Sequence, residues 1–173
     1  MKFIIMLTYV ISFFLFLSCG NKEKKAIDSA SLNNESNKES NYLSMKINGQ
    51  KWVADHDVFG AFHPKGYDKV IIIAGASGKK DKNEKTFNIN IYKTNGPGSF
   101  SFADGNTALS VAQIGNWTED EYLCGSMMGF DMKVQVTKAS NNPHEVEATF
   151  SGTMSCPSGA KLTITEGKFY YHE

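Results

Sequence analysis

Asp55, His56 and Asp57 are consecutive in the chain, and His63 follows a few residues later. Carboxylates and imidazoles are ligands for zinc, and carboxylates also bind calcium. The spacing of these residues matches no recognised metal motif, and surface Asp and His side chains in a loop are a more ordinary explanation. We therefore expect no metal and no cofactor. His56, Asp57 and His63 are only weak metal candidates, and as a site they would suit a metal-dependent hydrolase.

Aromatic residues form a second set of candidates, because several of them fall in segments that read as loops. Loops on a rigid scaffold present binding residues, so these side chains could contact a ligand or a protein. The alternative is that they fold inward and close the ends of the domain. The candidates are Trp52, Phe59, Phe62, Tyr67, Trp117 and Tyr122.

Nothing in the sequence requires an enzyme. Motifs for a serine nucleophile elbow, a zinc protease, a phosphate loop or a dinucleotide site are all missing. Four methionines could suggest copper(I), but Met132 and Met154 lie in alternating strand patterns, which favours packing in the core. The 18 basic and 18 acidic residues balance, so the sequence predicts no nucleic-acid partner.

The elements that position these residues read as strands joined by tight turns. Asn48-Gly49 lies between two alternating runs and predicts a type I′ hairpin. The apolar run 70–74 predicts a central strand, and at most one short helix is expected, near residues 118–122. We predict an all-β, antiparallel β-sandwich of about eight strands, with a small lipocalin-like β-barrel as the alternative. Apolar and polar residues alternate at 86–92, 130–136, 146–152 and 162–169.

Several turn and strand motifs resemble a family of uncharacterised Gram-negative envelope lipoproteins. The resemblance spans most of residues 44–170 and implies the fold, but it carries no activity. The motifs are Asn48-Gly49 before Trp52, Gly96-Pro97-Gly98 before Phe100, Phe150-Ser151-Gly152-Thr153, and Thr163-Ile164-Thr165 leading through Gly167 to Phe169.

The N-terminus predicts export. Lys2, an apolar run and a small residue at position 18 are typical of a signal peptide over residues 1–18. Phe16-Leu17-Ser18-Cys19 resembles the lipobox of bacterial lipoproteins, which implies that Cys19 is acylated and anchors the protein in a membrane. Residues 19–41 read as this cysteine and a disordered tether, and 42–173 as a single domain. Gly20 after Cys19 resembles the sorting signal for the outer membrane, with either its periplasmic or its surface-exposed face open.

Two modifications follow from export. Asp28-Ser29-Ala30 resembles an O-glycosylation site of some envelope proteins, which makes Ser29 a candidate. Cys124 and Cys156 form an even pair in an oxidising compartment. If the chain reverses near Pro143, they fall nearly opposite each other at the open end of that hairpin, so we predict a disulfide. A thiol nucleophile served by His144 is disfavoured, because His144 lies at the turn end.

The function that these observations favour is a non-enzymatic, lipid-anchored binding module for a protein, glycan or small molecule. An inhibitor or immunity-type accessory lipoprotein is the alternative.

Overall fold

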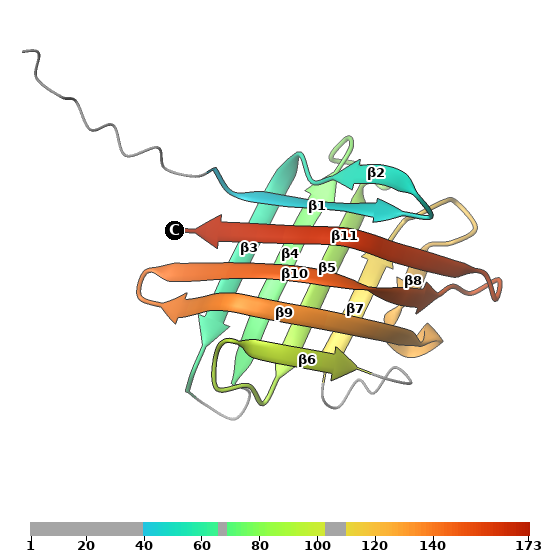
Figure 1. Ribbon diagram of the computed structural model, residues 1–173. Coiled ribbons are helices and arrows are strands. Elements are labelled where there is room, and N and C mark those ends of the chain that lie inside the picture. Colours follow the sequence, from blue (N-terminus) through green and yellow to red (C-terminus); the bar gives the residue numbers. More distant parts are fainter. Residues whose placement is uncertain (1–39, 66–68, 103–109) are drawn as a thin grey trace, which may run out of the picture. The chain divides into compact units, whose positions relative to one another are not determined.

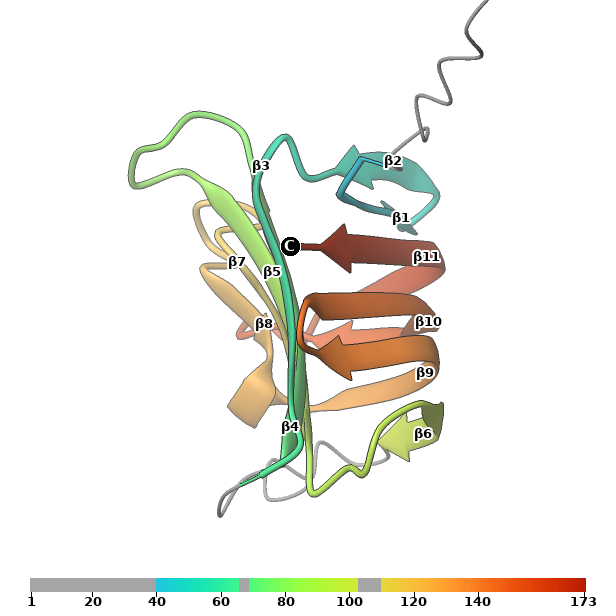
Figure 2. The ribbon, with the colours of Figure 1, turned by 90° about the vertical axis from the view of Figure 1, so that its left-hand side faces the viewer.

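The described residues of the computed structural model, 40–65, 69–102 and 110–173, form two antiparallel β-sheets (Figure 1). The six-stranded sheet has the order β2-β1-β11-β10-β9-β6, and the five-stranded sheet has the order β3-β4-β5-β7-β8. Viewed from the side, the sheets are two facing layers (Figure 2). The predicted antiparallel β-sandwich is confirmed, and the two sheets stay separate rather than closing into the alternative barrel.

More strands are present than the sequence predicted. They are β1 (Tyr42–Ile47), β2 (Gln50–Val53), β3 (His56–His63), β4 (Val70–Ser77), β5 (Lys85–Tyr92), β6 (Gly98–Phe102), β7 (Ser110–Gly115), β8 (Leu123–Gly125), β9 (Phe130–Asn141), β10 (His144–Ser155) and β11 (Lys161–His172).

The short helix expected near residues 118–122 is wrong. This segment is the connection between β7 and β8, and its backbone closes on itself across the loop. The amide of Asn116 donates to the carbonyl of Tyr122 at 2.9 Å, and the amide of Trp117 donates to the carbonyl of Glu121 at 3.0 Å. Because these bonds join the two sides of a loop, they leave no i→i−4 helical pattern. The helical turn in the described ranges is the 3₁₀ element η1 (Ser126–Met128).

The first hairpin forms as its turn residues predicted. Asn48 and Gly49 both have positive φ, 50° and 80°, as a type I′ turn between β1 and β2 requires. Asn48 also fixes this turn to β11, because its side-chain oxygen accepts from the Thr163 amide at 2.8 Å. The same two residues form a backbone bond, from the Asn48 amide to the Thr163 carbonyl. The turn therefore aligns β1 for pairing with β11.

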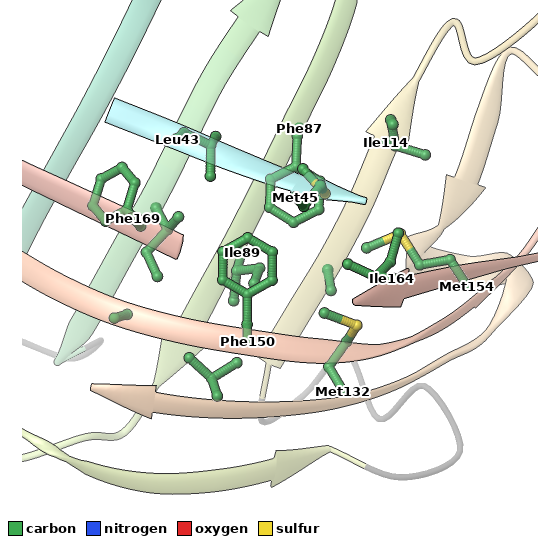
Figure 3. Close-up of a cluster of buried hydrophobic side chains, with 14 of the residues drawn as sticks. Leu43, Met45, Phe87, Ile89, Ile114, Met132, Phe150, Met154, Ile164 and Phe169 are labelled. Carbon is green, nitrogen blue, oxygen red and sulfur yellow. The ribbon is translucent and has the colours of Figure 1, made fainter. Parts of the chain in front are cut away.

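Apolar side chains from both sheets fill the space between the layers (Figure 3). Phe87 of β5 and Phe150 of β10 stack across it, with ring centroids 5.3 Å apart. Met132 and Met154 are 1% and 0% exposed, so the expectation that these methionines pack in the core is confirmed. Burial of this apolar surface is the main favourable term for a fold of this size.

Strand β3 was not predicted from the sequence, which read residues 55–63 as a loop. Its apolar residues do not alternate cleanly, since Gly60, Ala61 and Phe62 are all buried in succession. A side chain on Gly60 would lie 2.8 Å from Tyr171 Cβ and 2.9 Å from the ring of Phe169. The glycine therefore allows β3 to pass close over β11, and the two residues that follow it, Ala61 and Phe62, are both buried.

The predicted disulfide between Cys124 and Cys156 is confirmed. The hairpin geometry behind the prediction is wrong, because Cys124 is not on the strand that pairs with β10. It lies in β8 of the five-stranded sheet, whereas Cys156 directly follows β10 of the six-stranded sheet. The disulfide therefore links the two layers of the sandwich rather than two strands of one hairpin.

Candidate functional site

The outer face of the six-stranded sheet carries two rows of polar side chains that run across its strands. Strand register sets the first row, in which Gln135 pairs with Ser99 on one side and Thr149 on the other, and Thr149 pairs with Lys168. In the second row Lys133 lies between Ser101 and Ser151, with Glu166 beyond them on β11. We call this set the outer groove: Ser99, Ser101, Lys133, Gln135, Thr149, Ser151, Glu166 and Lys168.

The outer groove is a hollow of about 800 Å³. A second hollow of about 570 Å³ continues it along β9 and β10 and shares Ser101, Lys133 and Ser151. Towards β1, a smaller one shares Glu166 and Lys168. Ligand pockets of proteins typically measure about 300–1,000 Å³, so the groove has the size of a binding site.

Uncompensated positive charge lies in the groove. Glu166 forms an ion pair with Lys46, with 2.6 Å between Oε1 and Nζ. Within the part of the chain that the structure describes, no ion pair is found for Lys133 or Lys168. Lysine carries three donors and no acceptor, so both side chains favour an anionic or acceptor-rich ligand. The serine hydroxyls, the Thr149 hydroxyl and the Gln135 amide add donors and acceptors beside them.

The aromatic candidates lie in different places. Trp52 and Phe62 are 6% and 7% exposed and belong to the core, so they do not present a surface. Phe59 is 43% exposed on β3 and packs on Tyr171, with ring centroids 5.6 Å apart. Tyr67 lies outside the described residues.

The two remaining aromatic candidates lie at the opposite edge of the five-stranded sheet from β3. Lys85 Nζ is 4.7 Å from the ring centre of Trp117, a cation–π contact, and Tyr122 is 59% exposed. The structure therefore does not gather the aromatic candidates into one surface.

Of the metal candidates, His56 and Asp57 lie together, but His63 is at the other end of β3. The ring of His63 instead faces that of His144, with centroids 5.5 Å apart. Glu84, just before β5, takes the place expected for His63, and its Oε1 is 2.7 Å from His56 Nε2. No pattern in the sequence indicated Glu84, because only the β4–β5 hairpin brings it beside the start of β3.

Neighbouring groups shift the pKa values of Asp55, His56 and Asp57. His56 Nδ1 contacts the Asp55 carboxylate. Lys80 Nζ donates to both carboxylate oxygens of Asp57, at 2.9 Å each. Hydrogen bonds to Glu84 and then Asp55 raise the pKa of His56 above its ordinary value. The pKa of Asp55 is lowered mainly by a hydrogen bond from the Gly78 amide and secondly by the one with His56. A hydrogen bond from Lys80 lowers the pKa of Asp57.

Lys138 is a further basic group on the outer face near the groove. Hydrogen bonds to Glu145 and then Glu147 raise the pKa of Lys138. Lys138 Nζ also lies 5.6 Å from the ring centre of Tyr170, which stacks on Tyr42. Since two glutamates more than balance its charge, Lys138 does not add to the excess positive charge of the groove.

Cys19 and Ser29 lie outside the described residues, so their predicted modifications stay predictions. In the ranges that are described, no helix is long and apolar enough to cross a membrane. Comparisons of the chain with protein-family models, curated proteins and solved structures give no match.

Proposed function

We propose that this protein is a lipid-anchored, non-catalytic binding module of the bacterial envelope, and that its outer groove binds an acidic glycan. The observation that carries the proposal is the pair of cross-strand polar rows with two lysines that have no ionic partner among the described residues. The lipid anchor rests on the sequence around Cys19. An anchored module of this kind would hold the glycan close to the membrane.

The chemistry of the rows suits a chain of sugars. Serine and threonine hydroxyls both donate and accept, as sugar hydroxyls do, and an amide offers separate donor and acceptor atoms. Neighbouring strands are about 4.8 Å apart, so the rows present such groups at regular intervals across the sheet. Lys133 and Lys168, on different strands, supply charge-assisted bonds for carboxylates along the ligand.

Charge and sugar recognition can be separated with one pair of ligands. Calorimetric titration with oligogalacturonate should show binding that weakens as salt is added, because exposed charges are screened. The methyl ester of the same oligosaccharide keeps the rings but loses the carboxylate charges, and it should bind more weakly.

Matched variants locate the site. Lys133→Met and Lys168→Met should each lower the affinity for oligogalacturonate about tenfold, the loss of roughly one charge-assisted hydrogen bond. Thr149→Val should weaken the binding of both oligogalacturonate and its methyl ester. Lys79→Met, in the exposed turn after β4, is the control and should bind as the wild type does. If the three groove variants bind oligogalacturonate as tightly as Lys79→Met does, the proposed groove is contradicted.

A protein partner is the second candidate, in keeping with an inhibitor or immunity-type lipoprotein. Its support is the exposed apolar surface around β8, where Tyr122 precedes the strand and Met127 and Met128 follow it, at 59%, 82% and 37% exposure. A pull-down from detergent-solubilised envelope separates the two functions. One stoichiometric protein, lost in Met127→Ser but retained in Lys168→Met, would favour the protein partner over the glycan.

A further inference from the structure

We propose that His56, Asp57 and Glu84 form a binding site for a single zinc ion, independent of the outer groove. Their ligating atoms are His56 Nε2 and one carboxylate oxygen from each acid, and all three lie within 4.8 Å of one another. Nitrogen and oxygen ligands of this kind are typical of zinc. This site differs from the weak candidate set named from the sequence, because Glu84 takes the place of His63.

The separations between ligand atoms suit a tetrahedral ion. With zinc–ligand distances of about 2.0–2.2 Å, neighbouring ligands of a tetrahedral zinc are roughly 3.3–3.5 Å apart. His56 Nε2 lies 2.7 Å from Glu84 Oε1 and 3.9 Å from Asp57 Oδ2, on either side of that value. Changes of less than about 1 Å in these two separations would admit the ion. The side chains of His56 and Glu84 are 17% and 24% exposed, so they lie at an accessible surface.

Asp55 already holds the imidazole in the orientation that a zinc ligand needs. His56 Nδ1 contacts Asp55 Oδ1, and the other oxygen of Asp55 accepts from the Gly78 amide at 3.1 Å. A carboxylate on the far nitrogen of a zinc-bound histidine fixes the ring and strengthens the ligand. Here it leaves Nε2 directed at Glu84 and Asp57.

A β-bulge brings two successive side chains to one site. His56 pairs with Ala76 and Phe59 with Ala74, so β3 has one more residue than β4 over this stretch. Successive side chains of a regular strand point to opposite faces, but a bulge redirects one of them. Asp57, inside the bulge, has φ 50°, and its carboxylate reaches the same point as His56.

Lys80 is the competing cation, because its ammonium donates to both carboxylate oxygens of Asp57 at 2.9 Å. Its side chain is 63% exposed and can turn into solvent when a divalent ion replaces it. The other group of possible ligands in the described residues, Glu121 with Cys124 and Cys156, lacks thiolates because both cysteines are in the disulfide. The His56 group is therefore the stronger of the two.

Calorimetric titration of the full-length protein in detergent, produced without a histidine tag and stripped of metal by a chelator, tests the site. Zinc should bind with one ion per chain. His56→Asn and Glu84→Gln should each reduce the affinity more than tenfold, and Asp55→Asn by about 10–100-fold, as for a residue that orients a ligand. Cobalt(II) should give the intense visible absorption of a tetrahedral ion in the wild type and lose it in Glu84→Gln.

His63→Asn is the matched control, because this histidine belongs to the same strand but lies away from the cluster, and it should bind zinc as the wild type does. Unfolding in urea without metal verifies that each variant is folded, and if His56→Asn is not, Glu84→Gln decides. Unchanged zinc affinity in Glu84→Gln, loss of binding in His63→Asn, or no binding by the wild type would each overturn the site.

Discussion

Breaking the bond between Cys124 and Cys156 should remove a large part of the stability of this fold. The two cysteines are 32 residues apart in sequence, and the bond closes that loop in the unfolded chain. On the chain-entropy model, a loop of this length contributes about 3.7 kcal/mol at 25 °C. Domains are typically stable by about 5–15 kcal/mol, so the loss is measurable and leaves a smaller margin.

Urea unfolding of three samples gives the magnitude. The samples are the oxidised wild type, the wild type unfolded and refolded in reductant, and the double variant Cys124→Ala/Cys156→Ala. The reduced wild type retains both cysteine side chains, which are 0% and 4% exposed in the oxidised fold, so its loss reports mainly the covalent link. The alanine variant should lose somewhat more, because the side chains become smaller. Equal free energies of unfolding for oxidised and reduced wild type would refute the reasoning.

Two further predictions concern the stability contributed by Gly167 and the modification of Cys19. A Cβ on Gly167 would lie 2.3 Å from the Phe150 ring and 2.5 Å from the Phe150 carbonyl oxygen, so Gly167→Ala should destabilise by about 1–3 kcal/mol in urea unfolding. Gly98→Ala is its control, since a Cβ there has only ordinary contacts beyond 3.4 Å, and its effect should stay below about 1 kcal/mol. The intact mass of the mature protein should correspond to a chain that begins at Cys19 and carries added acyl chains. An unmodified Cys19 would contradict the predicted anchor.

Local patterns in the sequence predicted the strands that have one buried face. The alternation of Phe130, Met132, Val134 and Val136 placed β9 correctly, and all four residues are buried. The turn at Asn48-Gly49 also formed as predicted, because both signals act within a few residues. Alternation failed for β3, where close approach to β11 buries consecutive residues.

Candidate sites were harder to predict, because each depends on which strands become neighbours. Glu84 and His56 are 28 residues apart and meet only after β4 and β5 form a hairpin beside β3. The outer groove depends on the register of β6, β9, β10 and β11, and Ser99 lies 36 residues from its partner Gln135. Sequence spacing alone gives no register between strands so far apart.

One feature of the groove does have a signal in the sequence. Along β11 the buried residues that face the core are Leu162 and Ile164, then Gly167 and Phe169, so the inward positions change from even to odd numbers. A strand has a side-chain period of two, and this change therefore requires one extra residue between Ile164 and Gly167. The register with β10 shifts at this point, and Glu166 has φ 54°.

The consequence is that Glu166, which an unbroken alternation would direct into the core, lies exposed in the outer groove and pairs with Lys46. The same shift places Gly167 over the ring of Phe150, where the absence of a side chain lets the ring stack on Phe87. The bulge thus serves both faces of the sheet, since it keeps a carboxylate out of the core and sets the charge of the groove. Without Glu166, Lys46 would join Lys133 and Lys168 as a third lysine without an ionic partner among the described residues, so Glu166 limits how acidic a ligand the groove favours.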